Sequence, residues 1–267
     1  MIFVNKEVKV GIIHSVVFDF DGTLSLIRKG WQEIMTPYFT EVLMAAPNHG
    51  TLEEESHCAR EFIDLLTGKQ TIYQCIRLDE EVVKRGGQSI DPIVYKNEYH
   101  RRLLEKIDYR REGLATGDID PVEYLVPGSV ALLDMLKAHE VNLYLASGTD
   151  EKYVKEEVEL LGLTKYFAGE IYGARDDYKL FSKAMVIKRI ISENNLHGSS
   201  LAGFGDGYVE IENIKEVGGI AIGVATNEET MKGMDEWKLE RLTRAHADVI
   251  IEDFRNVRGI EKFLFKG

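Results

Sequence analysis

The chain has 267 residues, of which 44% are hydrophobic, 29% are charged and only 5 are proline. This balance is typical of a globular protein and excludes a low-complexity or fibrous chain. The 33 basic residues are outnumbered by 45 acidic ones, so the net charge is −12. Because a phosphate backbone would be repelled on average, nucleic acid is not expected as a partner.

The cysteines and the hydrophobic runs indicate the compartment. Cys58 and Cys75 lie 17 residues apart, without a metal-binding or disulfide spacing, which favours a reducing environment. No apolar run approaches the roughly 18 residues that a membrane span needs, and the segment Met1–Gly11 has no signal-peptide core. We therefore expect a cytoplasmic protein that binds no membrane and is a monomer or a homodimer.

The first predicted strand is the β-branched run 12–20, which ends abruptly at Asp21-Gly22-Thr23. From about residue 25 to residue 124 the strand pattern disappears, and hydrophobic residues recur at helical spacing. Glycine and proline residues separate four predicted helices in this block, at 34–43, 58–66, 72–83 and 95–107.

After residue 127 the pattern changes to strands that alternate with amphipathic helices. The predicted strands are 141–146, 170–172, 200–204, 219–224 and 248–251, and the predicted helices are 129–139, 153–161 and 181–193. Such alternation predicts an α/β fold with a parallel, doubly wound sheet. The first strand has no partner until Val141, so the helical block is an insertion. We expect residues 1–24 and 125–267 to form the core and residues 25–124 an all-helical cap.

Polar residues follow several predicted strands, where an open α/β sheet binds its ligands. They are Asp19-Phe20-Asp21-Gly22-Thr23 after the first strand, Ser147-Gly148-Thr149 after the second, and Gly205-Asp206-Gly207 with Glu210 after the fourth. Lys183 lies in the helix before that fourth strand. Each motif taken alone is typical of a turn. Their convergence at strand ends favours a catalytic site.

In these motifs the sequence resembles the haloacid dehalogenase superfamily, in its phosphatase branch with a helical cap inserted after the first motif. The likeness covers nearly the whole chain: D-x-D-G-T is residues 19–23, the hydroxyl residue of the second motif is Ser147, and G-D-G with a later acid is residues 205–210. For the lysine of the third motif, Lys183 lies 23 residues before Asp206 and fits the family spacing better than Lys179.

The resemblance and the chemistry of these residue types imply attack on a phosphate ester. An Asp carboxylate is anionic at neutral pH, and Asp19 is expected to take the phosphoryl group as an aspartyl phosphate. Asp21 is expected to protonate the leaving alcohol and later to deprotonate the attacking water. Asp19, the Asp21 carbonyl and Asp206 are predicted to hold Mg²⁺. Glu210 is a further candidate ligand, at a position where many relatives carry Asp.

The transferred phosphoryl group spreads negative charge over its oxygens, which cations and hydrogen-bond donors can hold. Lys183 is predicted to bind the phosphate and is therefore also a catalytic residue. The other predicted phosphate-binding groups are the Ser147 hydroxyl and the backbone at Gly22, Thr23 and Gly148. No nucleotide cofactor is expected.

A cap over such a site excludes water and contacts the leaving group, so specificity residues are expected there. Gln70 and Gln74 lie at a predicted helix junction, where they can hydrogen-bond the hydroxyls of a sugar or polyol phosphate. An equally weighted alternative is a helix N-terminus capped by Thr67, with both glutamines on the surface. Lys96 is a further candidate because it begins a basic segment that ends at Arg111, although a solvated helix face explains that segment as well.

We therefore predict a Mg²⁺-dependent phosphatase that hydrolyses a small phosphorylated metabolite, such as a sugar or polyol phosphate, through an aspartyl phosphate. A phosphomutase of the β-phosphoglucomutase type keeps every motif and is the nearest alternative. An inorganic pyrophosphatase is another, and a phosphonate-cleaving enzyme would need a cap lysine such as Lys69 or Lys96. The presence of both Asp19 and Asp21 disfavours a catalytically idle protein, and the metal-binding aspartates disfavour a true dehalogenase.

Overall fold

The computed structural model describes residues 1–8, 10–175, 182–195 and 198–265. The chain divides into two compact units: a core unit, Met1–Lys29 with Arg110–Gly267, and a helical unit, Gly30–Tyr109. The helical unit is shorter than the predicted insertion of 25–124. The reason is that the segments on either side of it pair with each other in the core: Leu26 N–H donates to the Tyr124 carbonyl, and Val126 N–H donates to the Leu24 carbonyl.

The helical unit contains the four helices that hydrophobic periodicity predicts. They are α1 (Gln32–Met44), α2 (Leu52–Leu66), α3 (Thr71–Lys84) and α4 (Pro92–Thr116), whose last turns belong to the core unit. A capping box starts α2, because the Thr51 hydroxyl accepts the Glu54 N–H and the Glu54 carboxylate accepts the Thr51 N–H. The rings of Phe39 and Phe62 stack between α1 and α2, with centroids 5.8 Å apart.

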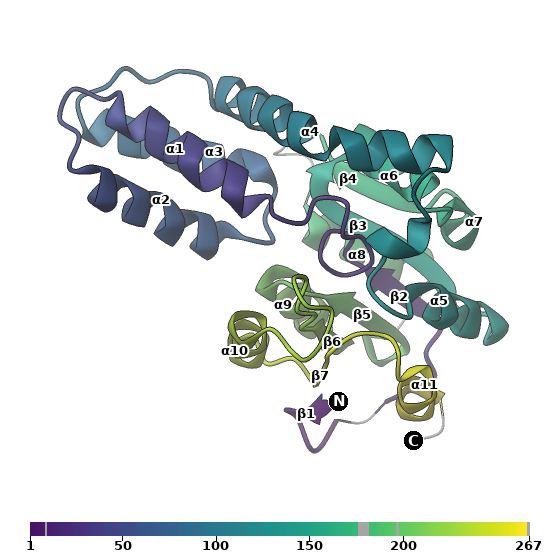
Figure 1. Cartoon of the computed structure of the whole chain (residues 1–267). Coiled ribbons are helices and arrows are strands. Elements are labelled where there is room, and N and C mark those ends of the chain that lie inside the picture. The colour runs from purple at the N-terminus through teal and green to yellow at the C-terminus, as the bar shows by residue number, and fades with distance from the viewer. Residues whose placement is uncertain (9, 176–181, 196–197, 266–267) are drawn as a thin grey trace. The chain divides into compact units, whose positions relative to one another are not determined.

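The described part of the core unit contains a seven-stranded sheet in the order β1-β7-β6-β5-β2-β3-β4 (Figure 1). The strands are β1 (Ile2–Phe3), β2 (Ser15–Phe18), β3 (Asn142–Asp150), β4 (Ile171–Ala174), β5 (Leu201–Gly205), β6 (Ile220–Val224) and β7 (Val249–Ile251). All neighbouring strands are parallel except β1, which is antiparallel to β7. The predicted doubly wound α/β fold with an inserted helical unit is confirmed, and the antiparallel edge strand is an addition to it.

Helices cover both faces of this sheet. They are α5 (Ser129–Ala138), α6 (Glu151–Leu160), α7 (Thr164–Phe167), α8 (Lys183–Glu193), α9 (Tyr208–Glu216), α10 (Glu236–Arg244) and α11 (Val257–Phe265), with 3₁₀ turns at Pro121–Tyr124 and Gly198–Ser200. Val17 of β2 packs in a buried cluster with Ile187 of α8 and Ile214 of α9. Because side chains alternate along a strand, Phe18 lies on the opposite face, where its ring stacks on Phe204 at 5.0 Å. None of the described helices combines the length and hydrophobicity that a membrane span requires.

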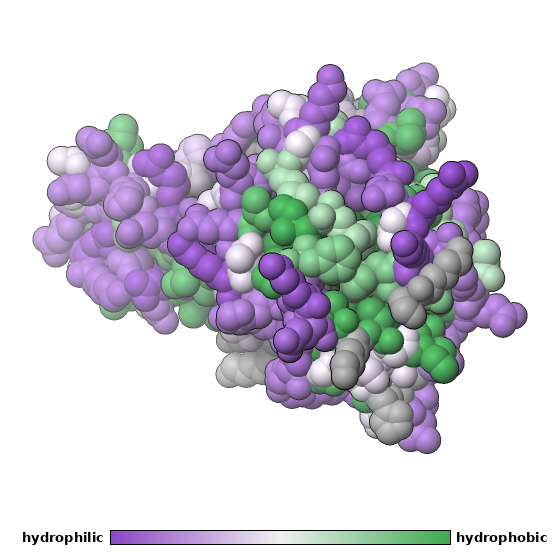
Figure 2. All heavy atoms as spheres, turned by 90° about the horizontal axis from the view of Figure 1, so that it is seen from below, coloured by the Kyte–Doolittle hydropathy of each residue, from purple (hydrophilic) through white to green (hydrophobic). Residues whose placement is uncertain are grey.

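The edge strand β1 carries partly exposed hydrophobic residues. It lies at the bottom of Figure 1, and the view from below shows hydrophobic side chains gathered among hydrophilic ones (Figure 2). Met1, Ile2 and Phe3 are 39%, 43% and 48% exposed. Phe3 also packs edge-on against Phe263 of α11, with ring centroids 5.6 Å apart. A two-residue strand has too few positions for a sequence pattern, which is why this element was not predicted.

Two arginines hold the segment that precedes the helical unit. Arg110 donates to the carbonyl oxygens of Ile27 at 2.7 Å and Lys29 at 2.9 Å, so it ties together the two points where the chain leaves and re-enters the core unit. Arg28 donates to both carboxylate oxygens of Glu157 at 2.7 to 3.1 Å, and the two side chains are 6% and 0% exposed. Burial raises the pKa of Glu157, and Arg28 offsets only part of that effect.

We expect Arg28→Met to destabilise the protein strongly, because it leaves the Glu157 carboxylate buried without its cation. Removing one partner of a buried ion pair typically costs about 3–5 kcal/mol in the free energy of unfolding, which urea denaturation measures. Arg189→Met is the matched control, since it breaks the exposed Arg189–Glu193 pair of α8 and is expected to change stability far less. Equal losses in the two variants would contradict this account of the buried pair.

Candidate active site

The carboxyl ends of three neighbouring strands bring the sequence motifs together. β2 lies between β3 and β5, and Phe18 of β2 is in register with Phe204 of β5. The Asp19 N–H extends this ladder by donating to the Phe204 carbonyl at 2.9 Å. Asp19, Ser147 and Asp206 therefore lie at the same edge of the sheet, as parallel pairing requires.

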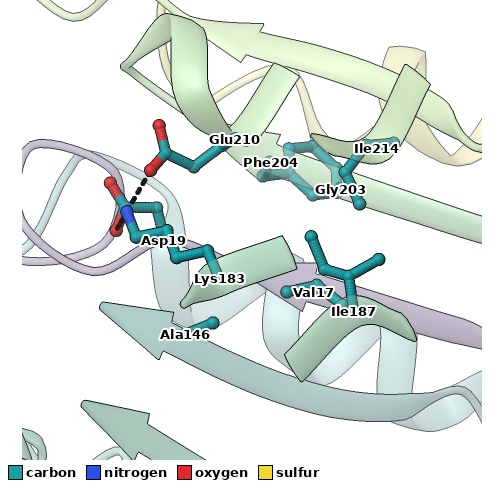
Figure 3. Close-up of a pocket in the computed structure, with 9 residues that line it drawn as sticks. All are labelled: Val17, Asp19, Ala146, Lys183, Ile187, Gly203, Phe204, Glu210 and Ile214. Atoms are coloured by element: carbon teal, nitrogen blue, oxygen red, sulfur yellow. Dashed lines mark hydrogen bonds and ion pairs between the residues drawn. The ribbon is translucent and has the colours of Figure 1, made fainter. Parts of the chain in front are cut away.

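One buried lysine joins the first motif to the fourth. Lys183 Nζ lies 2.8 Å from Asp19 Oδ1 and also forms an ion pair with Glu210 Oε1. Figure 3 shows both carboxylates directed at this nitrogen, from the end of β2 and from the first turn of α9. Lys183 is placed by its helix cap, because the Ser182 hydroxyl accepts the Met185 N–H and α8 begins at the next residue. The other candidate, Lys179, lies outside the described residues.

A narrow cavity adjoins this cluster on the side of the sheet core (Figure 3). Its volume is only about 10 Å³, far below the roughly 300 to 1,000 Å³ of small-molecule pockets. Apart from Asp19, Lys183 and Glu210, its lining is apolar: Val17, Ala146, Ile187, Gly203, Phe204 and Ile214. The cavity is therefore the apolar floor of the site.

Burial and neighbouring charges shift the pKa values of Asp19 and Lys183, which line this cavity. Burial raises the pKa of Asp19 well above its usual value; Lys183 lowers it, while Glu210 and Asp206 raise it further. Burial alone would lower the pKa of Lys183, but Asp19 and Glu210 outweigh it and raise that pKa. Lys183 therefore remains a cation, and it is the group that favours the anionic form of Asp19.

Asp21 is held by two hydroxyl groups of β3. Thr149 Oγ1 donates to Asp21 Oδ2 at 2.8 Å, and Ser147 Oγ donates to the same oxygen at 3.3 Å. These residues stand on either side of Gly148, two positions apart, which places both on one side of the strand. The other oxygen, Asp21 Oδ1, is buried, has no hydrogen-bond partner among the described residues and lies 3.8 Å from Arg28 Nε. Thr149 was not predicted as a site residue, although its spacing from Ser147 was the available signal.

The turn of the first motif is shaped by the fourth. Gly22 has φ +75°, in the left-handed region, and its N–H donates to the Ser25 carbonyl at 2.9 Å. Thr23 is fully buried, and its hydroxyl accepts the Asp206 N–H at 3.0 Å. A Cβ added to Gly22 would lie 2.2 Å from Asp206 Oδ2 and 3.0 Å from Glu228 Oε1. The missing side chain at Gly22 thus makes room for two carboxylates.

A second buried lysine, absent from every motif, holds these two carboxylates. Lys238 Nζ lies 2.8 Å from Asp206 Oδ2 and 2.6 Å from Glu228 Oε1. Burial raises the pKa of Glu228 against the opposing effect of Lys238. Burial would lower the pKa of Lys238, but Asp206 and Glu228 outweigh it and raise that pKa. The only signal in the sequence was the place of Glu228, shortly after the β6 strand.

The predicted metal-binding residues suit a hard divalent cation. Within the described ranges, no three acidic, histidine or cysteine side chains form a ready cage. Mg²⁺ needs no such cage, since it commonly binds one or two carboxylates together with water and substrate phosphate. Asp206 lies close enough to Asp19 to raise its pKa, and Asp21 Oδ1 and Glu210 Oε2 are buried without a hydrogen-bond partner among the described residues. These carboxylate oxygens fit Mg²⁺. The other oxygen of Glu210 forms the ion pair with Lys183.

The three candidate specificity residues of the helical unit are buried. Gln70, Gln74 and Lys96 are 5%, 4% and 3% exposed. Gln74 Nε2 donates to the Ile63 carbonyl at 3.4 Å. The alternative with surface glutamines is therefore wrong. Thr67 ends α2 and donates its hydroxyl to the same carbonyl at 2.9 Å, so it does not cap α3.

Solved structures share this fold over nearly the whole chain. β-Phosphoglucomutase from Clostridium difficile is 14% identical with a TM-score of 0.64, covering 96% of this chain and 98% of that one. A predicted phosphatase from Clostridium acetobutylicum is 20% identical with a TM-score of 0.61, covering 96% of this chain and 100% of that one. A predicted phosphoglycolate phosphatase from Haemophilus somnus is 16% identical with a TM-score of 0.60, covering 93% of this chain and 97% of that one. At such low identities the likeness shows the fold.

The sequence itself identifies the family. Among curated proteins, none matches it significantly. Residues 13–218 match the haloacid dehalogenase-like hydrolases, a stretch that contains Asp19, Ser147, Lys183, Asp206 and Glu210. Because this match extends over most of the chain, the protein belongs to the haloacid dehalogenase-like hydrolase family.

Proposed function

We propose that this hydrolase is a Mg²⁺-dependent phosphatase that cleaves a small phosphorylated metabolite through an aspartyl phosphate on Asp19. The observation that carries the proposal is the ion pair between Lys183 Nζ and Asp19 Oδ1, at 2.8 Å on an apolar floor. A carboxylate must be anionic to attack phosphorus. Since burial opposes that form, the lysine beside Asp19 supports its assignment as the nucleophile.

In the first half of the reaction, a carboxylate oxygen of Asp19 forms a bond to phosphorus as the bond to the leaving oxygen breaks. Asp21 donates a proton to that oxygen, which leaves as an alcohol. The hydrogen bonds of Ser147 and Thr149 to Asp21 Oδ2 hold the carboxyl group in place, and among the described residues no hydrogen bond to Oδ1 competes for the proton. Lys183 stabilises the charge on the phosphoryl oxygens.

In the second half, Asp21 accepts a proton from water, whose oxygen attacks the phosphorus of the aspartyl phosphate and releases the Asp19 carboxylate. Mg²⁺, held by Asp19, the Asp21 carbonyl and Asp206, would supply positive charge beside the phosphate oxygens. The Ser147 hydroxyl and the Gly148 backbone are proposed as further phosphate donors. Gly22 and Thr23 are proposed to shape the turn beside the phosphate, because the Gly22 N–H already donates to the Ser25 carbonyl and the Thr23 N–H to the Phe20 carbonyl. Thr23 also ties the first motif to Asp206.

The leaving group is proposed to be a sugar or polyol, recognised by Gln70, Gln74 and Lys96 of the helical unit. Their amide and ammonium groups can hydrogen-bond hydroxyls. The proposed reaction needs no nucleic acid and no membrane. A cytoplasmic location and a monomeric or homodimeric state remain predictions from the sequence.

A second candidate is a phosphomutase of the β-phosphoglucomutase type. The fold of the Clostridium difficile β-phosphoglucomutase, which covers 96% of this chain, favours it. Such an enzyme would use Asp19 and Asp21 in the same way but return the phosphoryl group to a second hydroxyl of the sugar. A panel of phosphorylated metabolites and pyrophosphate, assayed with and without Mg²⁺ for both released phosphate and isomerised product, separates phosphatase, mutase and pyrophosphatase.

We expect Asp19→Asn to abolish phosphate release without changing the fold, because an amide is a poor nucleophile of nearly the same shape. Phosphate release from p-nitrophenyl phosphate and thermal unfolding measure the two effects. Asp134→Asn is the control: it alters a carboxylate that accepts the Tyr166 hydroxyl elsewhere in the core unit, and it should retain activity. Substantial turnover by Asp19→Asn would rule out the nucleophile assignment.

Alanine substitutions at Gln70, Gln74 or Lys96 should lower kcat/KM for the best sugar or polyol phosphate by about 10-fold, the equivalent of one polar contact of roughly 1.4 kcal/mol. The small ester p-nitrophenyl phosphate should be cleaved almost normally, because the core unit alone holds the phosphoryl group. Arg60→Ala, an exposed position of α2, is the control. An equal loss on both substrates would show that these residues do not act through the leaving group.

Gly22→Ala and Gly117→Ala should both add backbone strain, but only Gly22→Ala should impair catalysis. Both glycines have φ near +80°, where a side chain adds about 1–2 kcal/mol of strain. Only at Gly22 does the new Cβ collide with Asp206, since nothing lies within 4 Å of one at Gly117. Displacing such a carboxylate by about 1 Å can lower the rate about 100-fold, so kcat/KM should fall in Gly22→Ala alone. Equal activity in both variants would contradict the role of Asp206.

A further inference from the structure

Four carboxylates of the core unit are held in two pairs, each pair by one lysine. The two clusters are Asp19–Lys183–Glu210 and Asp206–Lys238–Glu228. The first consists of family motifs. In the second, only Asp206 belongs to a motif, and the other two residues come from the segment after β6 and from α10. The second cluster therefore needs an explanation of its own.

Lys238 holds Asp206 through its Oδ2 oxygen. Its Nζ lies 2.8 Å from Asp206 Oδ2, while the Asp206 N–H donates to Thr23 Oγ1 at 3.0 Å. The backbone and one carboxylate oxygen of Asp206 are thus both fixed. Among the described residues, the contacts of Asp206 use its N–H and Oδ2, so Oδ1 is the oxygen that we assign to a ligand.

Lys238 is itself fixed at both ends. Its N–H donates to the side chain of Asp235, which caps α10, at 2.9 Å. Its ammonium donates to Glu228 Oε1 at 2.6 Å. Both side chains are largely buried. A long, flexible side chain anchored in this way can set the direction of a neighbouring carboxylate.

We propose that Lys238, anchored by Glu228, is a positioning residue that orients Asp206 for binding a divalent cation. The inference rests on the proposed Mg²⁺ site. Without the ammonium, the carboxylates of Asp206 and Glu228 would stand side by side and repel, and Asp206 would turn away from its metal-binding direction. Groups that orient a metal ligand typically contribute about 10- to 100-fold to metal affinity.

Orientation and net charge make opposite predictions for the loss of Lys238. Removing a positive charge by itself strengthens the attraction of the site for a cation. Removing the group that orients Asp206 weakens binding. The sign of the change in Mg²⁺ affinity therefore distinguishes a positioning residue from a cation that merely competes with the metal.

Titration of the full chain with MgCl₂ in a calorimeter, without substrate, measures this sign. Lys238→Met is expected to weaken Mg²⁺ binding about 10- to 100-fold, whereas Lys238→Arg should retain most of the affinity because a guanidinium can still bridge two carboxylates. Glu228→Gln should change affinity little, since its amide oxygen still accepts from Lys238. Combining Lys238→Met with Glu228→Gln should restore part of the affinity, because the repulsion is gone and the amide can donate to Asp206.

Lys215→Met is the matched control. Lys215 also pairs with a buried aspartate, Asp248, at 2.7 Å, outside the site. This variant should lose thermal stability but keep its Mg²⁺ affinity. A general loss of folding would lower both quantities in both lysine variants, and thermal unfolding of each protein identifies that case.

Unchanged or tighter Mg²⁺ binding by Lys238→Met would overturn the proposal, as would a failure of the added Glu228→Gln to restore affinity. If Lys238→Met alone does not fold, the double variant is compared with Glu228→Gln, and equal affinities for these two would overturn it as well. Absence of Mg²⁺ binding by the unmodified protein would instead overturn the metal site of the proposed function, and this inference with it.

Discussion

Carboxylates that are buried close together repel one another, and around one end of its sheet the core unit of this protein holds four carboxylates in two pairs, each bridged by a lysine. Buried charges persist only where opposite charges and hydrogen bonds compensate for lost hydration. Lys183 and Lys238 each serve two carboxylates. The helix cap at Ser182, the bare turn at Gly22 and the cap of α10 at Asp235 all place these few atoms. The local geometry of the site follows from the need to balance this charge.

The fold was largely predictable because its long elements carry strong periodic patterns. The run 12–20 gave β2, and the four helices of the insertion appeared at helical spacing. The misses have physical causes. Ser147-Gly148-Thr149 looks like a turn, yet β3 continues through it to Asp150. The helical unit ends at Tyr109, inside α4, and because the helical pattern continues through this point the sequence carries no signal for the boundary.

The site was predictable only where its chemistry lies in short segments. Asp19, Asp21 and Asp206 stand in contiguous motifs, and Lys183 was found by its distance from Asp206. Lys238 belongs to no motif, and its contact with Asp206 depends on the packing of α10 near α9 and β6. Tertiary contacts of this kind leave no local pattern in the sequence. They appear only when side chains from separate elements are seen together.

The hydrogen bonds of Arg110 to Ile27 and Lys29 have a consequence for how such a protein can change during evolution. They hold the two ends of the insertion beside each other within the core unit. Once its ends are joined, the entropy of closing a segment grows only slowly with length, by about 0.6 kcal/mol for each doubling. Insertions of different sizes can therefore be exchanged at this position while the strand ends that carry Asp19 and Asp206 stay as they are.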